Sequence, residues 1–252
     1  MKQWVEYDFD VNGFQIHTVY NNQTIQEVFL PLLQKMTALW EQKKGRILVY
    51  LAAPPATGKT TLCQFLEYLS RNTEGVHDIQ SIGLDGFHYH ADYIKTHTAV
   101  VKGKEIPMKE VKGCPETYDI DRLTEKLRRM RTEDVLWPVY SRALHDVIED
   151  QVTVNGDIIL IEGNWLLLKD EKWRDLKQLC DYSIMIRGDE QLLKERLIER
   201  KMKGGSAEQE AAYFYEHSDG VNVRRTMQDS QPADLFLILE ADGDYQAMSE
   251  CE

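Results

Sequence analysis

The amino-acid sequence predicts an α/β protein in which a mainly parallel, five-stranded sheet lies between two layers of helices. The first observation is that short apolar runs alternate with amphipathic helical patterns along most of the 252 residues, as they do in parallel sheets covered on both faces. The second is that acidic or glycine residues directly follow several of these runs, where parallel strands present their functional ends. The third is Asn12-Gly13 between two alternating segments, which indicates a β-hairpin ahead of the sheet.

The expected elements follow in chain order. Residues 1–22 are predicted to form the N-terminal hairpin, and a helix is expected from about residue 24 to residue 42. The predicted strands of the sheet are residues 46–53, 79–84, 157–161, 182–186 and 235–239. The predicted helices between them are residues 59–70, 120–131, 171–179, 189–203 and 207–227. The long segment 89–118 is expected to be a substrate-side flap, and residues 189–229 a helical lid.

Composition limits the class of protein. Hydrophobic residues make up 42% of the chain, enough to bury one α/β core, so we expect a single domain over residues 1–252. The formal net charge of −12 disfavours nucleic acids and anionic membranes as partners, because both require basic patches. The N-terminus is acidic where a signal peptide would be apolar, and the cysteines have no paired spacing, so we expect a cytoplasmic protein. A homodimer is left open.

The segment between the strand at 46–53 and the helix at 59–70 indicates a nucleotide. A glycine, lysine and threonine at a helix start, after a buried strand, are typical of loops that bind phosphates. Glycine lets the backbone approach the phosphates, lysine adds a positive charge, and the threonine hydroxyl is a ligand for Mg²⁺. We expect the nucleotide to be bound by Ala53, Pro54, Pro55, Ala56, Thr57, Gly58, Lys59, Thr60 and Thr61.

One residue departs from this pattern. Ala53 stands where the first glycine of the loop is usual. A left-handed backbone conformation at that position would cost an alanine about 1 kcal/mol.

Two further strands are followed by acidic residues. Asp85 comes after the run at 79–84, and Glu162 comes after residues 158–161. Because the carboxyl ends of parallel strands meet at one edge of the sheet, both are expected near Lys59. Asp85 would accept a proton from a hydroxyl or orient Mg²⁺, and Glu162 would lie on the metal side. The alternatives are an aspartate in a turn and a helix N-cap acid.

The order of these motifs resembles the P-loop kinase superfamily of uridine kinase, phosphoribulokinase and type I pantothenate kinase. It is most similar to bacterial nucleoside/nucleotide kinase-like proteins, also called fructose-transport kinase-like. The resemblance covers about residues 48–227 and depends, after the phosphate loop, on residues 85–88, 113–119, 138–146 and 161–163. It implies a P-loop NTPase fold, ATP and Mg²⁺ as cofactors, and transfer of the γ-phosphate to a hydroxyl of a small metabolite.

The resemblance also implies roles for single residues. Lys59 and Asp85 would be catalytic, and Thr60, Glu162 and Asp85 would hold the metal. The acceptor would be contacted by His88, Tyr140, Arg142 and His145. Tyr140 and His145 have an alternative interpretation, as parts of a solvated loop or, for the histidine, of a core satisfied by the backbone.

Arginines of the predicted lid complete the expected site. Arg196 and Arg200 lie four residues apart on one helix face. The resemblance implies lid arginines in this region, where they would neutralise charge during phosphoryl transfer and so count as catalytic. A solvated, charged helix is the alternative. Arg224 and Arg225 form a second basic pair that would have to approach the nucleotide to take part.

The sequence leaves alternatives open for the identity of the acceptor and for the activity. Pantothenate is favoured by residues 113–119 and 138–146, a sugar such as fructose by residues 85–88, and a pyrimidine nucleoside by His145; a sugar-like alcohol ranks first by a narrow margin. The rival function is a nucleotide-binding regulatory protein without kinase turnover, because Ala53 and Ala56 replace glycines that are common in such loops. The guanine-reading sequence Asn-Lys-x-Asp does not occur, which disfavours a GTPase.

Overall fold

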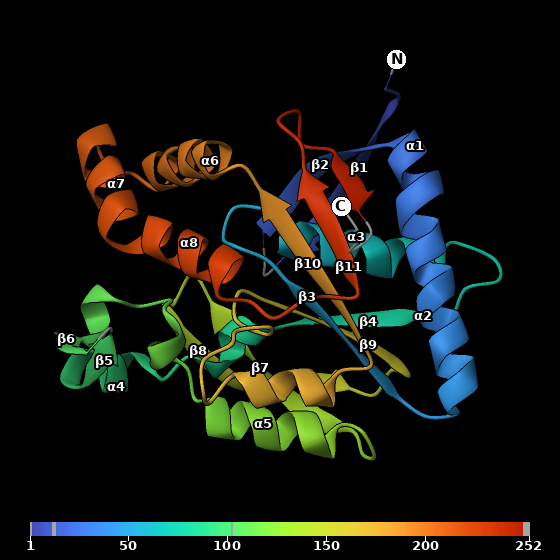
Figure 1. Ribbon diagram of the computed structural model, residues 1–252, viewed down its shortest axis with the longest axis horizontal. Coiled ribbons are helices and arrows are strands. Elements are labelled where there is room, and N and C mark those ends of the chain that lie inside the picture. Colours follow the sequence, from blue (N-terminus) through green and yellow to red (C-terminus); the bar gives the residue numbers. More distant parts are fainter. Residues whose placement is uncertain (1, 12–13, 102, 249–252) are drawn as a thin grey trace.

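The computed structural model describes residues 2–11, 14–101 and 103–248 and has a six-stranded sheet at its centre (Figure 1). The strand order is β12-β11-β10-β3-β9-β4. All neighbours are parallel except β12, which pairs antiparallel with β11. The bounds are β3 Ile47–Ala52, β4 Ile79–Gly83, β9 Ile158–Gly163, β10 Tyr182–Gly188, β11 Leu235–Leu239 and β12 Tyr245–Met248. The predicted fold class and its five parallel strands are confirmed, while β12 was not predicted.

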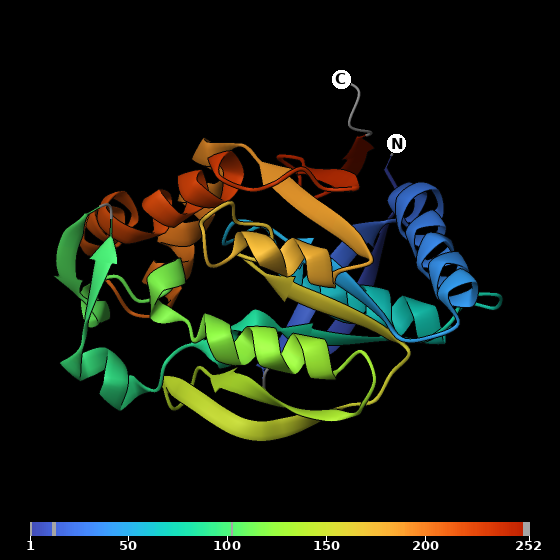
Figure 2. The ribbon, with the colours of Figure 1, turned by 60° about the horizontal axis from the view of Figure 1, so that its bottom comes forward.

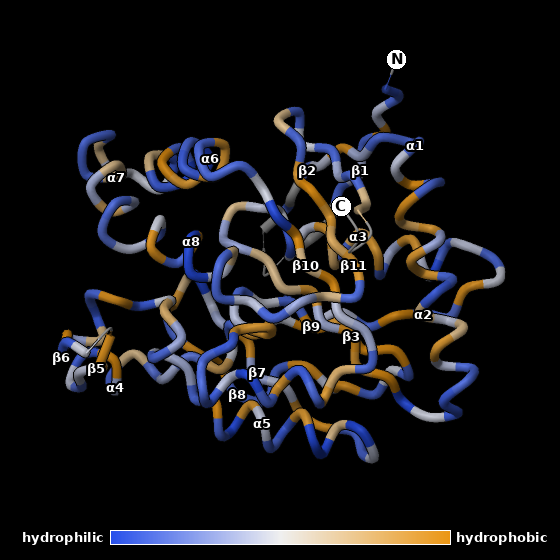
Figure 3. Tube along the Cα trace, in the orientation of Figure 1, coloured by the Kyte–Doolittle hydropathy of each residue, from blue (hydrophilic) through white to orange (hydrophobic). Residues whose placement is uncertain are grey.

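Each face of the sheet has its own hydrophobic core. Because side chains alternate along a strand, Val49 and Leu51 of β3 lie in one core and Leu48 and Tyr50 in the other. Figure 2 shows the helical layers above and below the strands, and Figure 3 shows apolar residues concentrated along them. One layer contains α2 (Leu30–Lys43), α3 (Lys59–Arg71) and α6 (Glu190–Lys203), and the other contains α5 (Ile120–Arg129).

The N-terminal hairpin is present. Strands β1 (Trp4–Val11) and β2 (Phe14–Asn21) pair antiparallel, and the predicted turn residues 12 and 13 lie outside the described residues. Tyr20 of the hairpin stacks on Phe65 of α3, with ring centroids 4.1 Å apart. The hairpin therefore covers the helix that follows the phosphate loop.

Three predicted helices differ from expectation. The helix predicted at about 24–42 is divided into α1 (Asn22–Thr24), a π-helical turn at Ile25–Phe29 and α2. Residues 171–179 hold a 3₁₀ helix at Arg174–Leu179 instead of an α-helix. Its apolar residues Trp173, Leu176 and Leu179 recur every three positions and pack on one core, which suits the three residues per turn of a 3₁₀ helix. The helix predicted at 207–227 is α7 (Glu208–Phe214), then a π-helical turn, then α8 (Gly220–Gln228).

Two hairpins were not predicted. The first, β7 (Val135–Ser141) with β8 (Asp146–Val154), contains Pro138 at a shift of register, and a proline inside a run weakens a strand prediction. The second lies within residues 89–118, where α4 (Ala91–Thr96) precedes β5 (Thr98–Val101) and β6 (Lys104–Pro107). That segment therefore has secondary structure of its own and is not an open loop. None of the described helices is long and apolar enough to cross a membrane.

Asp244, just before β12, joins the two ends of the described chain. Its carboxylate is buried and accepts hydrogen bonds from the Thr24 hydroxyl at 2.7 Å and the Asn21 amide at 2.9 Å. The Lys2 ammonium lies 3.0 Å away. Burial by itself would raise the pKa of Asp244, but these three partners lower it below the ordinary value of 3.8.

We predict that Asp244→Asn lowers stability in a pH-dependent way. A depressed folded-state pKa means that the charged carboxylate stabilises the fold above about pH 4 and that this contribution is lost as the pH falls through the folded-state pKa. Urea unfolding should show a free energy of unfolding lower by about 1–3 kcal/mol at pH 7. The difference should shrink below pH 4; an equal loss at both pH values would contradict the role of the charge.

Candidate active site

The phosphate loop lies between β3 and α3. Gly58 caps α3 with φ +81°, and Ala56 has φ +67°. Ala53, in contrast, is not among the non-glycine residues with positive φ, and its buried N–H points to the Gly163 carbonyl at 3.4 Å. The left-handed backbone conformation that was considered for Ala53 is therefore not found at that residue. The alanine in the left-handed region is Ala56, because the chain turns there and not at the strand end.

Hydrogen bonds brace this loop from behind. The Tyr245 hydroxyl of β12 donates to the Thr57 carbonyl at 2.7 Å, and the Thr57 hydroxyl donates to the Pro54 carbonyl at 2.9 Å. A Cβ on Gly58 would lie 2.9 Å from the Tyr245 hydroxyl, so glycine is needed there for space as well as for φ. The first amides of α3 have no helical partner and, with the helix dipole, form a site for anions.

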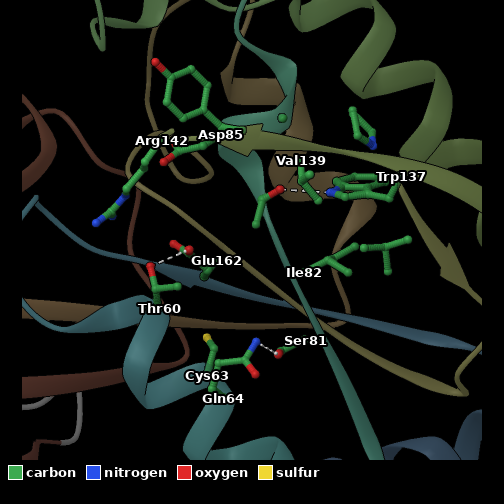
Figure 4. Close-up of a pocket in the computed structure, with 15 residues that line it drawn as sticks. Thr60, Cys63, Gln64, Ser81, Ile82, Asp85, Trp137, Val139, Arg142 and Glu162 are labelled. Atoms are coloured by element: carbon green, nitrogen blue, oxygen red, sulfur yellow. Dashed lines mark hydrogen bonds between the residues drawn. The ribbon is translucent and has the colours of Figure 1, made fainter. Parts of the chain in front are cut away.

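Glu162 at the end of β9 lies beside the start of α3. The Thr60 hydroxyl donates to its carboxylate at 2.7 Å, as Figure 4 shows. The side chain is 8% exposed. Burial, with a smaller contribution from the charge of Asp85, raises the pKa of Glu162 above 4.5, and Lys59 opposes this shift. A hydroxyl and a carboxylate are thus held together where the resemblance implied a metal.

Asp85 lies in a 3₁₀ turn, Leu84–Phe87, directly after β4. Its side chain is exposed to the cleft, and the Tyr118 hydroxyl donates to Oδ1 at 3.0 Å. The surrounding protein atoms would by themselves raise the pKa of Asp85. The charge of His88 when its ring is protonated, the charges of Lys59 and Arg142, and the hydrogen bond from Tyr118 outweigh that effect, so the pKa lies below 3.8 and the carboxylate is ionised at neutral pH.

His88 packs behind this carboxylate. Its Nδ1 is 2.9 Å from the Asp85 carbonyl, and because a carbonyl only accepts, Nδ1 carries the proton in this bond. The imidazole is buried against the Tyr118 ring, with centroids 3.8 Å apart. Burial lowers the pKa of His88 below 6.5, so the ring is neutral at pH 7.

Two cavities meet at Asp85, Thr60 and Arg142. The larger, about 770 Å³, lies between the phosphate loop, α6, α8 and the segment around Lys112. The smaller, about 140 Å³, lies between α3, β4 and the β7–β8 hairpin. Figure 4 shows Asp85, Arg142, Thr60 and Glu162 around the smaller one. A nucleotide of several rings and phosphates requires the larger cavity.

Gly86 brings the hairpin to this site. A Cβ on Gly86 would lie 2.0 Å from the Pro138 carbonyl oxygen, so only glycine allows β7 to approach the turn that holds Asp85. Tyr140 consequently lines the smaller cavity and Arg142 lines both.

Of the remaining residues that were expected at the site, some line a cavity and others do not. Arg196 and Arg200 line the larger cavity with the phosphate loop. His145 lines neither cavity: it is exposed in the hairpin turn with φ +53°, and only its carbonyl is used, as an acceptor for Lys112 at 3.1 Å. Arg224 and Arg225 are instead occupied in ion pairs, with Glu190 for the first and with Glu116 and Asp170 for the second.

Several residues of the cleft were not predicted from the sequence. Lys112, Tyr118, Asn164, Asp219 and Asn222 all line the larger cavity. Tyr118 lies within the motif at 113–119, so the sequence contained a signal for its place beside Asp85. The other four residues were not among the expected site residues.

No family model matches the chain. The uncharacterized protein YggC of Escherichia coli (strain K12) is 40% identical over 246 residues, which cover 97% of this chain and 100% of that protein. The chain belongs to the YggC family. A pantothenate kinase of Limosilactobacillus fermentum is 28% identical over 221 residues, covering 78% of this chain and 68% of that protein. A crystal structure of a "putative fructose transport system kinase" from Silicibacter sp. TM1040 matches with a TM-score of 0.68 and 28% identity, over 80% of this chain and 98% of that one.

These comparisons place the YggC family among P-loop kinases related to uridine kinase and pantothenate kinase, and the resemblance predicted from the motifs is confirmed.

We predict that Ala56→Gly stabilises the protein and that Ala53→Gly does not. Glycine relieves the left-handed strain at Ala56, which should raise the free energy of unfolding by about 1 kcal/mol. At Ala53 glycine only adds freedom to the unfolded chain and removes a buried methyl group. Thermal unfolding of the two variants beside the parent protein checks this; a gain at Ala53 and none at Ala56 would contradict the assignment.

Proposed function

We propose that the protein is an ATP- and Mg²⁺-dependent kinase that transfers the γ-phosphate to a hydroxyl group of a small metabolite. One observation supports this above the others: the ionised Asp85 carboxylate opens onto the cavity that is also lined by Lys59 and Thr60 of the phosphate loop. A protein that only binds a nucleotide has no need of a free carboxylate beside the phosphates.

The phosphate loop would bind ATP. The amides at the start of α3 would donate to the phosphate oxygens, and Lys59 would neutralise their charge. Arg196, whose guanidinium points to the Ala56 carbonyl at 3.5 Å, and Arg200 would add positive charge from the lid. A preformed arrangement of this kind stabilises the transferred phosphoryl group.

Thr60 and Glu162 fit a magnesium ion. Mg²⁺ in nucleotide sites takes one or two protein oxygens and completes its shell with phosphates and water. The hydroxyl and the carboxylate 2.7 Å apart supply two such oxygens, and Asp85 lies across the same cavity edge. When bound, Mg²⁺ supplies positive charge to the β- and γ-phosphates.

Asp85 would accept the proton of the acceptor hydroxyl. Tyr118 donates to Oδ1, which leaves Oδ2 for the acceptor. Neutral His88 fixes the turn through the Asp85 carbonyl without adding a competing positive charge. We propose that residues 89–118 act as a flap and residues 189–229 as a lid, which exclude water so that hydrolysis does not compete with transfer.

The function is tested by ADP release with Mg-ATP over a library of hydroxylated metabolites. Turnover that depends on one class of acceptor supports a kinase. Tight Mg-ATP binding by calorimetry without ADP formation from any acceptor would favour the nucleotide-binding regulatory protein instead.

We predict that Asp85→Asn reduces kcat by about 10²- to 10⁴-fold, the range for loss of a general base. The dissociation constant of ATP should change less than twofold, because the amide keeps the shape of the side chain. Asp78→Asn, at an exposed residue directly before β4, is the matched control and should keep full activity. Near-normal turnover of Asp85→Asn would exclude Asp85 as the base.

We predict that Glu162→Gln and Thr60→Val each raise the Mg²⁺ concentration needed for half-maximal turnover by about tenfold or more. The reason is that each variant removes one of the paired oxygens. Titrating MgCl₂ at a fixed ATP concentration measures this effect. Glu41→Gln, on α2 and far from the cleft, is the control; equal Mg²⁺ requirements in all four proteins would refute the assignment.

A further inference from the structure

The larger cavity carries positive charge in an acidic protein. Six lysine and arginine residues line it against three acidic ones, although the chain as a whole carries a net charge of −12. The basic residues are Lys59, Lys112, Arg142, Arg196, Arg200 and Lys203. A cleft lined mainly by charges of one sign attracts ligands of the opposite charge and concentrates them at the site.

A nucleotide accounts for only part of this charge. Lys59 belongs to the phosphate loop, and Arg196 and Arg200 come from the lid helix above it. Lys203 is paired with Glu199 at 2.7 Å. Lys112 and Arg142 come from other segments: the end of the flap and the turn of the β7–β8 hairpin, at the part of the cleft where Asp85 and Tyr118 lie.

Lys112 is held in place by neutral groups. Its ammonium donates to the Tyr140 hydroxyl at 2.8 Å and to the His145 carbonyl at 3.1 Å, and it lies 4.7 Å from the centre of the Tyr140 ring. Within the described part of the chain, no carboxylate forms an ion pair with it. An ammonium has three donors, so one N–H and the full charge are left for a ligand.

Arg142 is exposed where the two cavities meet, and its guanidinium forms no hydrogen bond or ion pair with any described residue. It acts on Asp85 and Glu162 only through its charge, by lowering the pKa of each. In the proposed kinase those two acids face Mg²⁺ and the acceptor proton. The guanidinium N–H groups of Arg142 therefore have no partner among the described residues. Their planar arrangement suits a carboxylate or a phosphate.

Resting on the proposed kinase activity, we propose that the acceptor is itself an anion: a small hydroxylated metabolite whose phosphate or carboxylate group is bound by Lys112 and Arg142 while its hydroxyl faces Asp85. A neutral sugar or nucleoside would leave the charges of Lys112 and Arg142 without a counter-charge from the acceptor. Discrimination against neutral acceptors would follow directly from this arrangement.

Matched acceptor pairs test the proposal. ADP release is measured with a sugar phosphate and its free sugar, a hydroxy acid and its primary amide, and a nucleoside monophosphate and its nucleoside. In any pair whose anionic member is phosphorylated, kcat/KM for the anionic member should be about 100-fold or more higher than for the neutral member. The phosphate and carboxylate pairs distinguish the two anions. A neutral member that is used as well as its anionic partner would overturn the proposal.

Two variants locate the anion. Arg142→Gln and Lys112→Gln should each raise KM for the anionic acceptor by about 10- to 100-fold, with kcat less affected. KM for ATP should change less than twofold. Lys35→Gln, at an exposed residue of α2, is the control and should keep the parent values. An unchanged KM for the acceptor in both cleft variants would overturn the assignment.

A binding experiment separates this inference from the proposed function. If no acceptor yields ADP, the kinase proposal fails. The protein saturated with Mg²⁺ and a non-hydrolysable ATP analogue is then titrated with inorganic phosphate by calorimetry. A saturable site that Arg142→Gln weakens about tenfold, and Lys35→Gln does not, supports the anion site independently. Absence of such binding, or binding that both variants retain, would overturn it.

Discussion

The site depends on the register of three adjacent parallel strands. Ala52 at the end of β3 is opposite Gly163 of β9, and Glu162 of β9 is opposite Gly83 of β4. The phosphate loop follows β3, the turn with Asp85 follows β4, and Glu162 is the penultimate residue of β9 between them. A slip of one residue in either pairing would turn Glu162 into a core and move Asp85 out of reach of Lys59. The pairing of the backbone thus places the residues of the site, independently of contacts between their side chains.

Glycines allow other segments to close on that edge. A Cβ on Gly163 would lie 2.5 Å from Leu84, so the strand end and the Asp85 turn pack directly together. Gly86 does the same for the β7–β8 hairpin. The arrangement places Tyr140 and Arg142 of the β7–β8 hairpin and Lys112 of another segment around one carboxylate. The resulting cleft is positive within a negative molecule, which reconciles an acidic composition with a ligand rich in phosphate.

The sequence predicted what is encoded in contiguous runs. Residues 53–61 of the phosphate loop form one contiguous run, and Asp85 and Glu162 directly follow apolar runs whose hydrophobic pattern identified the strands. Lys112 could not be found in this way, because it reaches the cleft only through a contact with Tyr140, 28 residues away. His145 was expected to use its side chain, but the left-handed turn leaves only its carbonyl in use. Arg225 was considered as a residue that could approach the nucleotide, but its guanidinium donates to Glu116, 109 residues away.

The strand β12 has a consequence for how the protein is made. Tyr245 supports the Thr57 carbonyl of the phosphate loop, and Asp244 binds Asn21 and Thr24 near the other end of the described chain. A nascent chain in which residue 245 is still inside the ribosome can form β3 and α3, but it lacks the brace behind the loop. The brace behind the phosphate loop therefore forms late in synthesis, after residue 245 has left the ribosome.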